Sequence, residues 1–251
     1  MTSNFVTHGC SSQGAFNADV KIEKKRVRKP VAKTNLFTIP QINYMPDFMH
    51  PYIEHIVDVK RDGNCGYRVI ALDDKNDEDD YELIKESMVN ELNLYKSIYL
   101  ELYGGEDRLA YITNALLPSK RRSRRHSVAL IEKWLTFPDM GHIVATILGK
   151  VVVKLTETFF PLRGIPPSNP SSLIVCIGAI PGHYVYVKLK DNCPIPPTCI
   201  QWKRYCSPDA IAWESFFVAR QAKFDKLMKE IIVDNNKKIR VGSNSNVPIE
   251  L

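Results

Sequence analysis

Apolar residues in the first half of the chain recur at intervals of three and four, the spacing that places side chains on one face of a helix. Between Tyr44 and Ile53 this spacing predicts a short helix that is interrupted or restarted at Pro51. A second helix is predicted at 107–117, before Pro118. The clearest helix precedes it and ends at Gly104-Gly105, with an apolar stripe formed by Ile84, Met88, Leu92, Tyr95, Tyr99 and Leu102.

The second half of the chain changes to short apolar runs of strand length. Strands are predicted at 151–155, 173–177 and 184–189, with proline- and glycine-rich segments between them. Residues 142–148 predict a short buried helix before the first strand, and residues 208–230 predict a helix after the last one. Helices followed by a strand-rich half predict an α+β (mixed α/β) domain, with a small central sheet flanked by helices.

Length and composition limit how the chain is organised. At 251 residues it can hold one sizeable core plus tails. We predict a disordered basic arm over 1–43, one domain over 44–229 and a polar tail over 230–251. No run approaches the roughly 18 apolar residues of a membrane span, so no membrane partner is expected. The six cysteines form no Cys-x-x-Cys pair, which argues against a zinc signature and favours a reduced, intracellular setting.

The net charge of +6 is concentrated in two short basic segments, residues 21–33 and 120–125, and the remainder is slightly acidic. The first segment has the composition of a nuclear-import signal or a phosphate-contacting patch; the alternative is a solvated tail without a partner. The second segment is either an insertion in an exposed loop or the second half of a bipartite import signal. We therefore expect a nuclear and/or cytoplasmic protein, with nucleic acid as a candidate partner of both segments.

Candidate chemistry gathers at residues 62–68, Asp-Gly-Asn-Cys-Gly-Tyr-Arg, between two apolar runs. Gly63 and Gly66 allow a sharp turn around Cys65, and the apolar residues that follow predict a helix beginning there. The free N–H groups and the positive dipole end of such a helix favour a thiolate and can hold an oxyanion. The alternative is that Cys65 is a small buried side chain beside a tight turn.

His183 is the best-placed partner for Cys65 among the six histidines. It follows Pro181-Gly182 and directly precedes the strand predicted at 184–189, so it can face a cleft from a strand end. An imidazole beside a cysteine can take the thiol proton and later protonate a leaving amine. Taken alone, a histidine in this position is more often a hydrogen-bonded loop residue.

Together, the two segments resemble the ovarian-tumour (OTU) family of cysteine proteases. Residues 62–68, followed by Ile70-Ala71, are similar to the nucleophile motif of that family, and Gly182-His183-Tyr184 is similar to its histidine motif. The resemblance covers roughly residues 44–229. Further blocks resemble the OTU-like domains of plant proteins derived from Mutator-type transposons, and they lie at 49–53, 134–136 with 138–141, 159–163 and 193–197.

This resemblance implies a papain-type fold and hydrolysis of an isopeptide or peptide bond at the C-terminus of ubiquitin or a ubiquitin-like modifier, with no metal or cofactor. Cys65 would be the nucleophile, and His183 the general base and acid. Backbone N–H groups around Gly63 and Asn64 would form the oxyanion hole, with Asp62 ordering that loop.

One position departs from the family pattern. Many OTU enzymes carry Asn or Asp two residues after the histidine, where this chain has Val185. The group that orients the imidazole would then be Asp62, Asp191 or Asn192, or it would be absent. A second hypothesis is therefore a catalytically weakened, transposon-derived module that binds ubiquitin or nucleic acid.

Overall fold

The structure is a computed structural model, and it describes residues 40–118 and 128–243. The predicted boundaries of the arm and of the tail remain predictions. Residues 1–39 and 244–251 lie outside the described ranges, and so do both basic segments.

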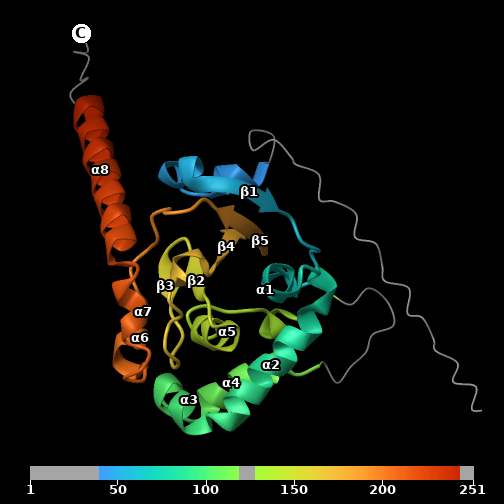
Figure 1. The fold of residues 1–251 in the computed structure, drawn as a ribbon. Coiled ribbons are helices and arrows are strands. Elements are labelled where there is room, and N and C mark those ends of the chain that lie inside the picture. Colours follow the sequence, from blue (N-terminus) through green and yellow to red (C-terminus); the bar gives the residue numbers. More distant parts are fainter. Residues whose placement is uncertain (1–39, 119–127, 244–251) are drawn as a thin grey trace, which may run out of the picture. The chain divides into compact units, whose positions relative to one another are not determined.

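A five-stranded mixed sheet lies at the centre of the fold (Figure 1). Its order is β1-β5-β4-β2-β3; β2 and β4 are parallel and the other neighbours are antiparallel. All three valines of β2 are fully buried, as expected for a strand covered on both faces. The strands are β1 (Ile53–Val57), β2 (Val151–Lys154), β3 (Glu157–Phe159), β4 (Ile174–Ile180) and β5 (His183–Leu189).

Helices surround this sheet, which gives the α+β class expected from the sequence. The α-helices are α1 (Cys65–Lys75), α2 (Tyr81–Leu94), α3 (Lys96–Tyr103), α4 (Glu106–Leu116), α5 (Gly141–Leu148), α6 (Ile200–Tyr205), α7 (Ala212–Ser215) and α8 (Val218–Ser243). Short 3-10 turns lie at η2 (Pro40–Tyr44), η3 (Asp47–Tyr52), η4 (Glu78–Asp80), η5 (Ile131–Lys133) and η6 (Pro170–Ser172). Helix α1 packs against strands β5 and β4 and against helix α2, which places its first residue at the sheet.

The prediction of one helix across 84–102 was wrong, because the chain leaves helical geometry at Tyr95 (φ −122°, ψ 36°). The apolar stripe is therefore divided between α2 and α3. The ring of Tyr95 is partly exposed and lies 3.3 Å below the guanidinium of Arg163. That guanidinium also pairs with the buried Glu91 carboxylate of α2, so an ion pair occupies the point where the stripe was expected to continue.

The helix expected between Tyr44 and Ile53 was also wrong. The structure has two 3-10 turns there, followed by strand β1 from Ile53, which pairs with Leu189 of β5. The helix predicted at 208–230 is divided into α7 and α8, and α8 continues to Ser243, into the expected polar tail. Strand β3 and helix α6 were not predicted. The three predicted strands and the helices at 107–117 and 142–148 are present, with shifts of a few residues at their ends.

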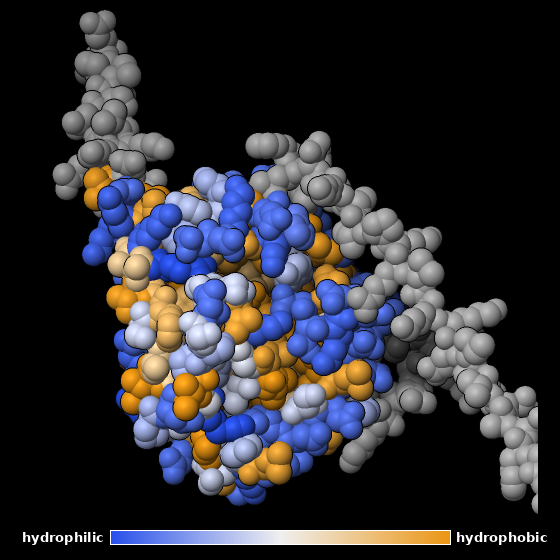
Figure 2. All heavy atoms as spheres, in the orientation of Figure 1, coloured by the Kyte–Doolittle hydropathy of each residue, from blue (hydrophilic) through white to orange (hydrophobic). Residues whose placement is uncertain are grey.

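In the described part of the chain, no helix has the length and apolar character that crossing a bilayer requires. Figure 2 shows one face of the molecule, on which hydrophobic residues lie singly or in small groups among hydrophilic ones. Most apolar side chains instead lie in the core between the sheet and the helices, which includes Tyr67 and Val69 of α1, Phe159 of β3 and Phe160 directly after it.

Candidate active site

Cys65 is the first residue of α1 and is almost fully buried. The turn before it depends on Gly63, whose φ of +78° is in the left-handed region that favours glycine. A side chain at Gly63 would also meet the Ala129 carbonyl oxygen and the Trp134 indole nitrogen, both at 2.7 Å. At Gly66 a Cβ would come within 2.6 Å of the Leu135 side chain. Both glycines therefore allow close packing around the nucleophile candidate.

The fold brings Cys65 against the start of β5. The backbone N–H of Tyr184 donates to Cys65 Sγ at 3.4 Å, and Tyr184 directly follows His183. These two segments are 119 residues apart in the sequence, so only the packing of α1 on β5 makes them neighbours. Within the described ranges, no hydrogen bond joins Cys65 Sγ to the His183 ring.

The thiol of Cys65 is protonated at neutral pH in this geometry. Burial raises its pKa above the ordinary value, and this outweighs the backbone N–H groups of Tyr184 and Gly66, which lower it. The sequence had suggested that the helix N-terminus would favour the thiolate; these N–H groups act in that direction, but burial is the larger effect. A base must therefore remove the proton before the sulfur can attack.

His183 has a carboxylate partner that the sequence did not reveal. Its Nε2 lies 2.7 Å from Asp58 Oδ1, and the histidine side chain is 1% exposed against 42% for the aspartate. Because an ionised carboxylate only accepts hydrogen bonds, Nε2 carries the hydrogen, and Nδ1 of the neutral ring is free to accept a proton. The other oxygen of Asp58 accepts from Gln41 Nε2 at 3.1 Å and lies 3.9 Å from Arg61.

Asp58 follows strand β1, and β1 is the neighbour of β5 in the sheet. This pairing places the end of β1 beside the start of β5, where His183 lies. The only sign of Asp58 in the sequence was the apolar run that precedes the nucleophile motif. The end of this run could be located from the sequence, but the strand with which it pairs could not. Asp58 is thus the functional candidate that sequence reasoning missed.

In the described part of the chain, the residues that the sequence suggested as partners of the His183 ring form no hydrogen bond with it. Val185 is fully buried opposite Gly178, and one of its methyl groups lies 2.9 Å from the position that a Cβ would take there. Asp62 accepts hydrogen bonds from Arg68 and from the Asn64 N–H. Among the described residues, neither Asp191 nor Asn192 bonds to the His183 ring, so the carboxylate that contacts it belongs to Asp58.

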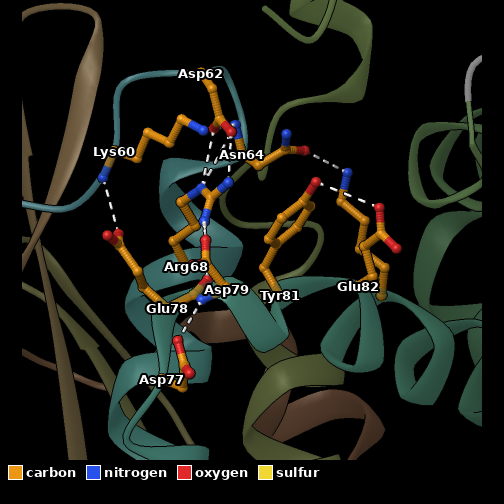
Figure 3. Close-up of polar contacts among 10 residues, drawn as sticks. Lys60, Asp62, Asn64, Arg68, Asp77, Glu78, Asp79, Tyr81 and Glu82 are labelled. Carbon is orange, nitrogen blue, oxygen red and sulfur yellow. Dashed lines mark hydrogen bonds and ion pairs between the residues drawn. The ribbon is translucent and has the colours of Figure 1, made fainter. Parts of the chain in front are cut away.

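Asp62 instead orders the loop before Cys65, in a network drawn in Figure 3. The buried Arg68 guanidinium donates hydrogen bonds to both carboxylate oxygens of Asp62 and to Asp79 Oδ1, the last at 2.8 Å. Burial alone would raise the pKa of the Asp62 carboxyl, but the hydrogen bonds from Arg68 and from the Asn64 N–H hold it below its usual value. The Asp62 carbonyl accepts from Ala129 N–H at 2.7 Å, which ties the loop to the chain after the second basic segment.

The expected oxyanion donors are only partly free. The backbone N–H of Asn64 already donates to Asp62 Oδ1 at 2.9 Å. The N–H of Cys65 lies at the first position of α1, where a helix leaves N–H groups without intrahelical acceptors. The Asn64 side chain lies next to it, and its Oδ1 accepts from Lys85 Nζ at 2.7 Å. Of the two backbone donors, the N–H of Cys65 therefore has no acceptor within its helix, whereas the N–H of Asn64 is already engaged.

No group of three or more His, Cys, Asp or Glu side chains suited to a metal ion occurs within residues 40–118 and 128–243. The cysteines in those ranges are all free thiols. The side chains described at this site are a thiol, an imidazole and a carboxylate.

No protein-family model matches the sequence, and the curated proteins include no similar one. Among solved structures, the chain is similar to the viral OTU domain protease from Dera Ghazi Khan virus, with 11% identity and a TM-score of 0.43 over 57% of this chain and 85% of that one. It is also similar to the viral OTU domain protease from Farallon virus, with 17% identity and a TM-score of 0.34 over 54% of this chain and 83% of that one.

Proposed function

We propose that the protein is an OTU-like thiol hydrolase that cleaves isopeptide or peptide bonds at the C-terminus of ubiquitin or a ubiquitin-like modifier. The proposal depends on one observation about Cys65 and His183. The Cys65 sulfur accepts a hydrogen bond from the backbone N–H of Tyr184, and the ring of the preceding residue, His183, is hydrogen-bonded to a carboxylate. In this proposal the nucleophile, the base and the carboxylate that orients the base come from three separate segments of the chain. The motif at 62–68 and the Gly-His-Tyr at 182–184 supply the family resemblance.

In the proposed reaction, His183 Nδ1 takes the proton from Cys65 Sγ, and the thiolate attacks the carbonyl carbon of the modifier's last residue. The carbonyl π electrons move to its oxygen and form an oxyanion beside the first turn of α1. When the carbonyl re-forms, the carbon–nitrogen bond breaks and the imidazolium gives its proton to the leaving amine. Water, activated by His183, then hydrolyses the thioester and releases the modifier with a free carboxylate.

Asp58 has two tasks in this scheme. Its bond to Nε2 keeps the hydrogen on that nitrogen, so that Nδ1 is the one that accepts the thiol proton. Its negative charge also stabilises the imidazolium that forms when Cys65 is deprotonated. Asp62 acts at a distance from the reacting atoms, by holding the loop with Arg68. The scheme requires no metal and no cofactor.

A ubiquitin carrying an electrophile at its C-terminus tests the proposal, together with the corresponding probes of ubiquitin-like modifiers. We expect wild-type protein to form a covalent adduct with at least one probe and Cys65→Ala to form none. Cys206→Ala is the matched control, because Cys206 is a free and partly exposed thiol away from α1. If wild type stays unlabelled by every probe, or if Cys65→Ala is labelled as well as wild type, the proposal is wrong.

The alternative, a weakened module that binds ubiquitin or nucleic acid, depended on Val185 and on the two basic segments. The argument from Val185 was that the His183 ring lacks an orienting group, and the hydrogen bond from this ring to the Asp58 carboxylate speaks against it. The basic segments lie outside the described ranges. Nucleic-acid binding, nuclear or cytoplasmic location and a plant transposon origin therefore stay predictions from the sequence.

A further inference from the structure

Lys85 of helix α2 contacts Asn64, the residue directly before Cys65. Its Nζ donates to Asn64 Oδ1 at 2.7 Å and lies 4.3 Å from the centre of the Tyr67 ring. The Tyr81 ring is on another side, at 5.8 Å. The ion pairs among the described residues include none for Lys85, so its partners are one amide oxygen and two aromatic faces.

The Lys85 contact also decides which way the Asn64 amide points. A lysine ammonium has three hydrogens to donate and no acceptor, so the amide oxygen must face it. The amide nitrogen is consequently the atom of that group that does not face Lys85. Asn64 is the residue directly before Cys65 and is almost fully buried, so this orientation is held inside the turn.

We propose that Lys85 is a positioning residue: it fixes the side-chain amide of Asn64 so that its NH₂ group and the Cys65 N–H together stabilise the oxyanion. This inference rests on the proposed function, because it assigns a task in that reaction. A donor held in place before the reaction stabilises the developing charge without reorganising at that moment. Without Lys85 the amide can rotate, and its oxygen would then repel the oxyanion.

The charged groups around Lys85 give the contact a pH dependence. Burial and, to a smaller extent, the nearby ammonium of Lys133 on η5 lower the pKa of Lys85 to about 8, although Asp62 in the turn and Glu82 on α2 act in the opposite direction. Below about pH 8 the ammonium is charged and holds Asn64; above this pH it becomes a weaker, neutral donor. We therefore expect the turnover number to fall as the pH rises through this value.

The test compares wild type, Lys85→Met and Lys85→Arg on C-terminal aminocoumarin amides of ubiquitin and ubiquitin-like modifiers. Lys85→Met should lower kcat by at least about 10-fold with little change in KM. One oxyanion donor contributes about 10²- to 10³-fold to kcat, and a donor that is no longer correctly oriented loses part of this contribution. Lys85→Arg should restore most of kcat and move the alkaline limb of the kcat–pH profile upward, because a guanidinium stays charged. Lys96→Met, at an exposed lysine of α3, is the matched control.

Alkylation of Cys65 by iodoacetamide separates this role from an effect on the thiol, because that reaction forms no oxyanion. Its rate at pH 7 should be the same within 2-fold in wild type and Lys85→Met. The inference is overturned if Lys85→Met keeps its kcat, if alkylation falls in parallel with kcat, or if the alkaline limb is identical in Lys85→Arg. If wild type hydrolyses no amide of the set, the proposed function fails and this inference fails with it.

Discussion

The contact between His183 and Asp58 gives the sharpest test of the site. Replacing Asp58 with Ala removes a 2.7 Å hydrogen bond from a carboxylate to an imidazole that becomes charged during the reaction. Hydrogen bonds to charged groups contribute about 1.5–3 kcal/mol, and the 42% exposure of Asp58 places this one toward the lower end. At about 1.4 kcal/mol per factor of ten, a loss of roughly 1.5–2 kcal/mol should lower kcat/KM roughly 10- to 30-fold. Asp58→Asn should lose less, because an amide oxygen can still accept from Nε2.

The assay is hydrolysis of a modifier aminocoumarin amide, with Asp47→Ala as the matched control. Asp47 is a fully exposed aspartate that also lies near a histidine, His50 at 3.8 Å, so its loss should change kcat/KM less than 2-fold. In a His183→Ala background, Asp58→Ala should have almost no further effect, since both residues act as one unit. The reasoning is refuted if Asp58→Ala retains more than half of the wild-type kcat/KM, or if the two substitutions are additive.

Two further predictions concern the stability of the fold around the site. Arg68→Met should lower the free energy of unfolding, measured in urea, by about 3–5 kcal/mol, because it leaves Asp62 without its buried partner. Arg108→Met, at an arginine that is half exposed, should cost less than about 1 kcal/mol, and equal effects of the two substitutions would contradict this. Burial lowers the pKa of His142 to about 4, so between about pH 6.5 and pH 4 the unfolded state binds more protons and stability should fall by about 3 kcal/mol as the pH falls. His142→Phe should lose this pH dependence, and an unchanged slope would show that the ring does not titrate in this way.

Most elements with a clear local signal were predictable. The valine-rich run at 151–155 and the alternation at 184–189 gave strands because β-branched and aromatic residues pack well on a sheet. The stripe predicted at 84–102 is interrupted at one place, Tyr95, whose ring lies against the guanidinium that pairs with Glu91. Periodicity does not reveal such a long-range contact. Local spacing gives the face of a helix, but not the residue at which tertiary contacts break it.

The motif 62–68 shows how far the sequence determined the candidate site. Two glycines around a cysteine, with apolar residues after it, were enough to place Cys65 at the first residue of a helix, where the structure has it. His183 was likewise placed at a strand start from its own neighbours. These expectations depended on backbone preferences over a few residues, and such preferences act before any distant contact forms.

Only the tertiary structure decided what surrounds those two side chains. Asp58 contacts His183 because strand β1 pairs with β5, and Lys85 reaches Asn64 because α2 packs against α1. It also decided the protonation of Cys65, since burial in the folded state outweighs the nearby N–H groups. Partners separated by 125 residues, as Asp58 and His183 are, meet only through the order of strands in a sheet, and no local pattern in the chain records that order.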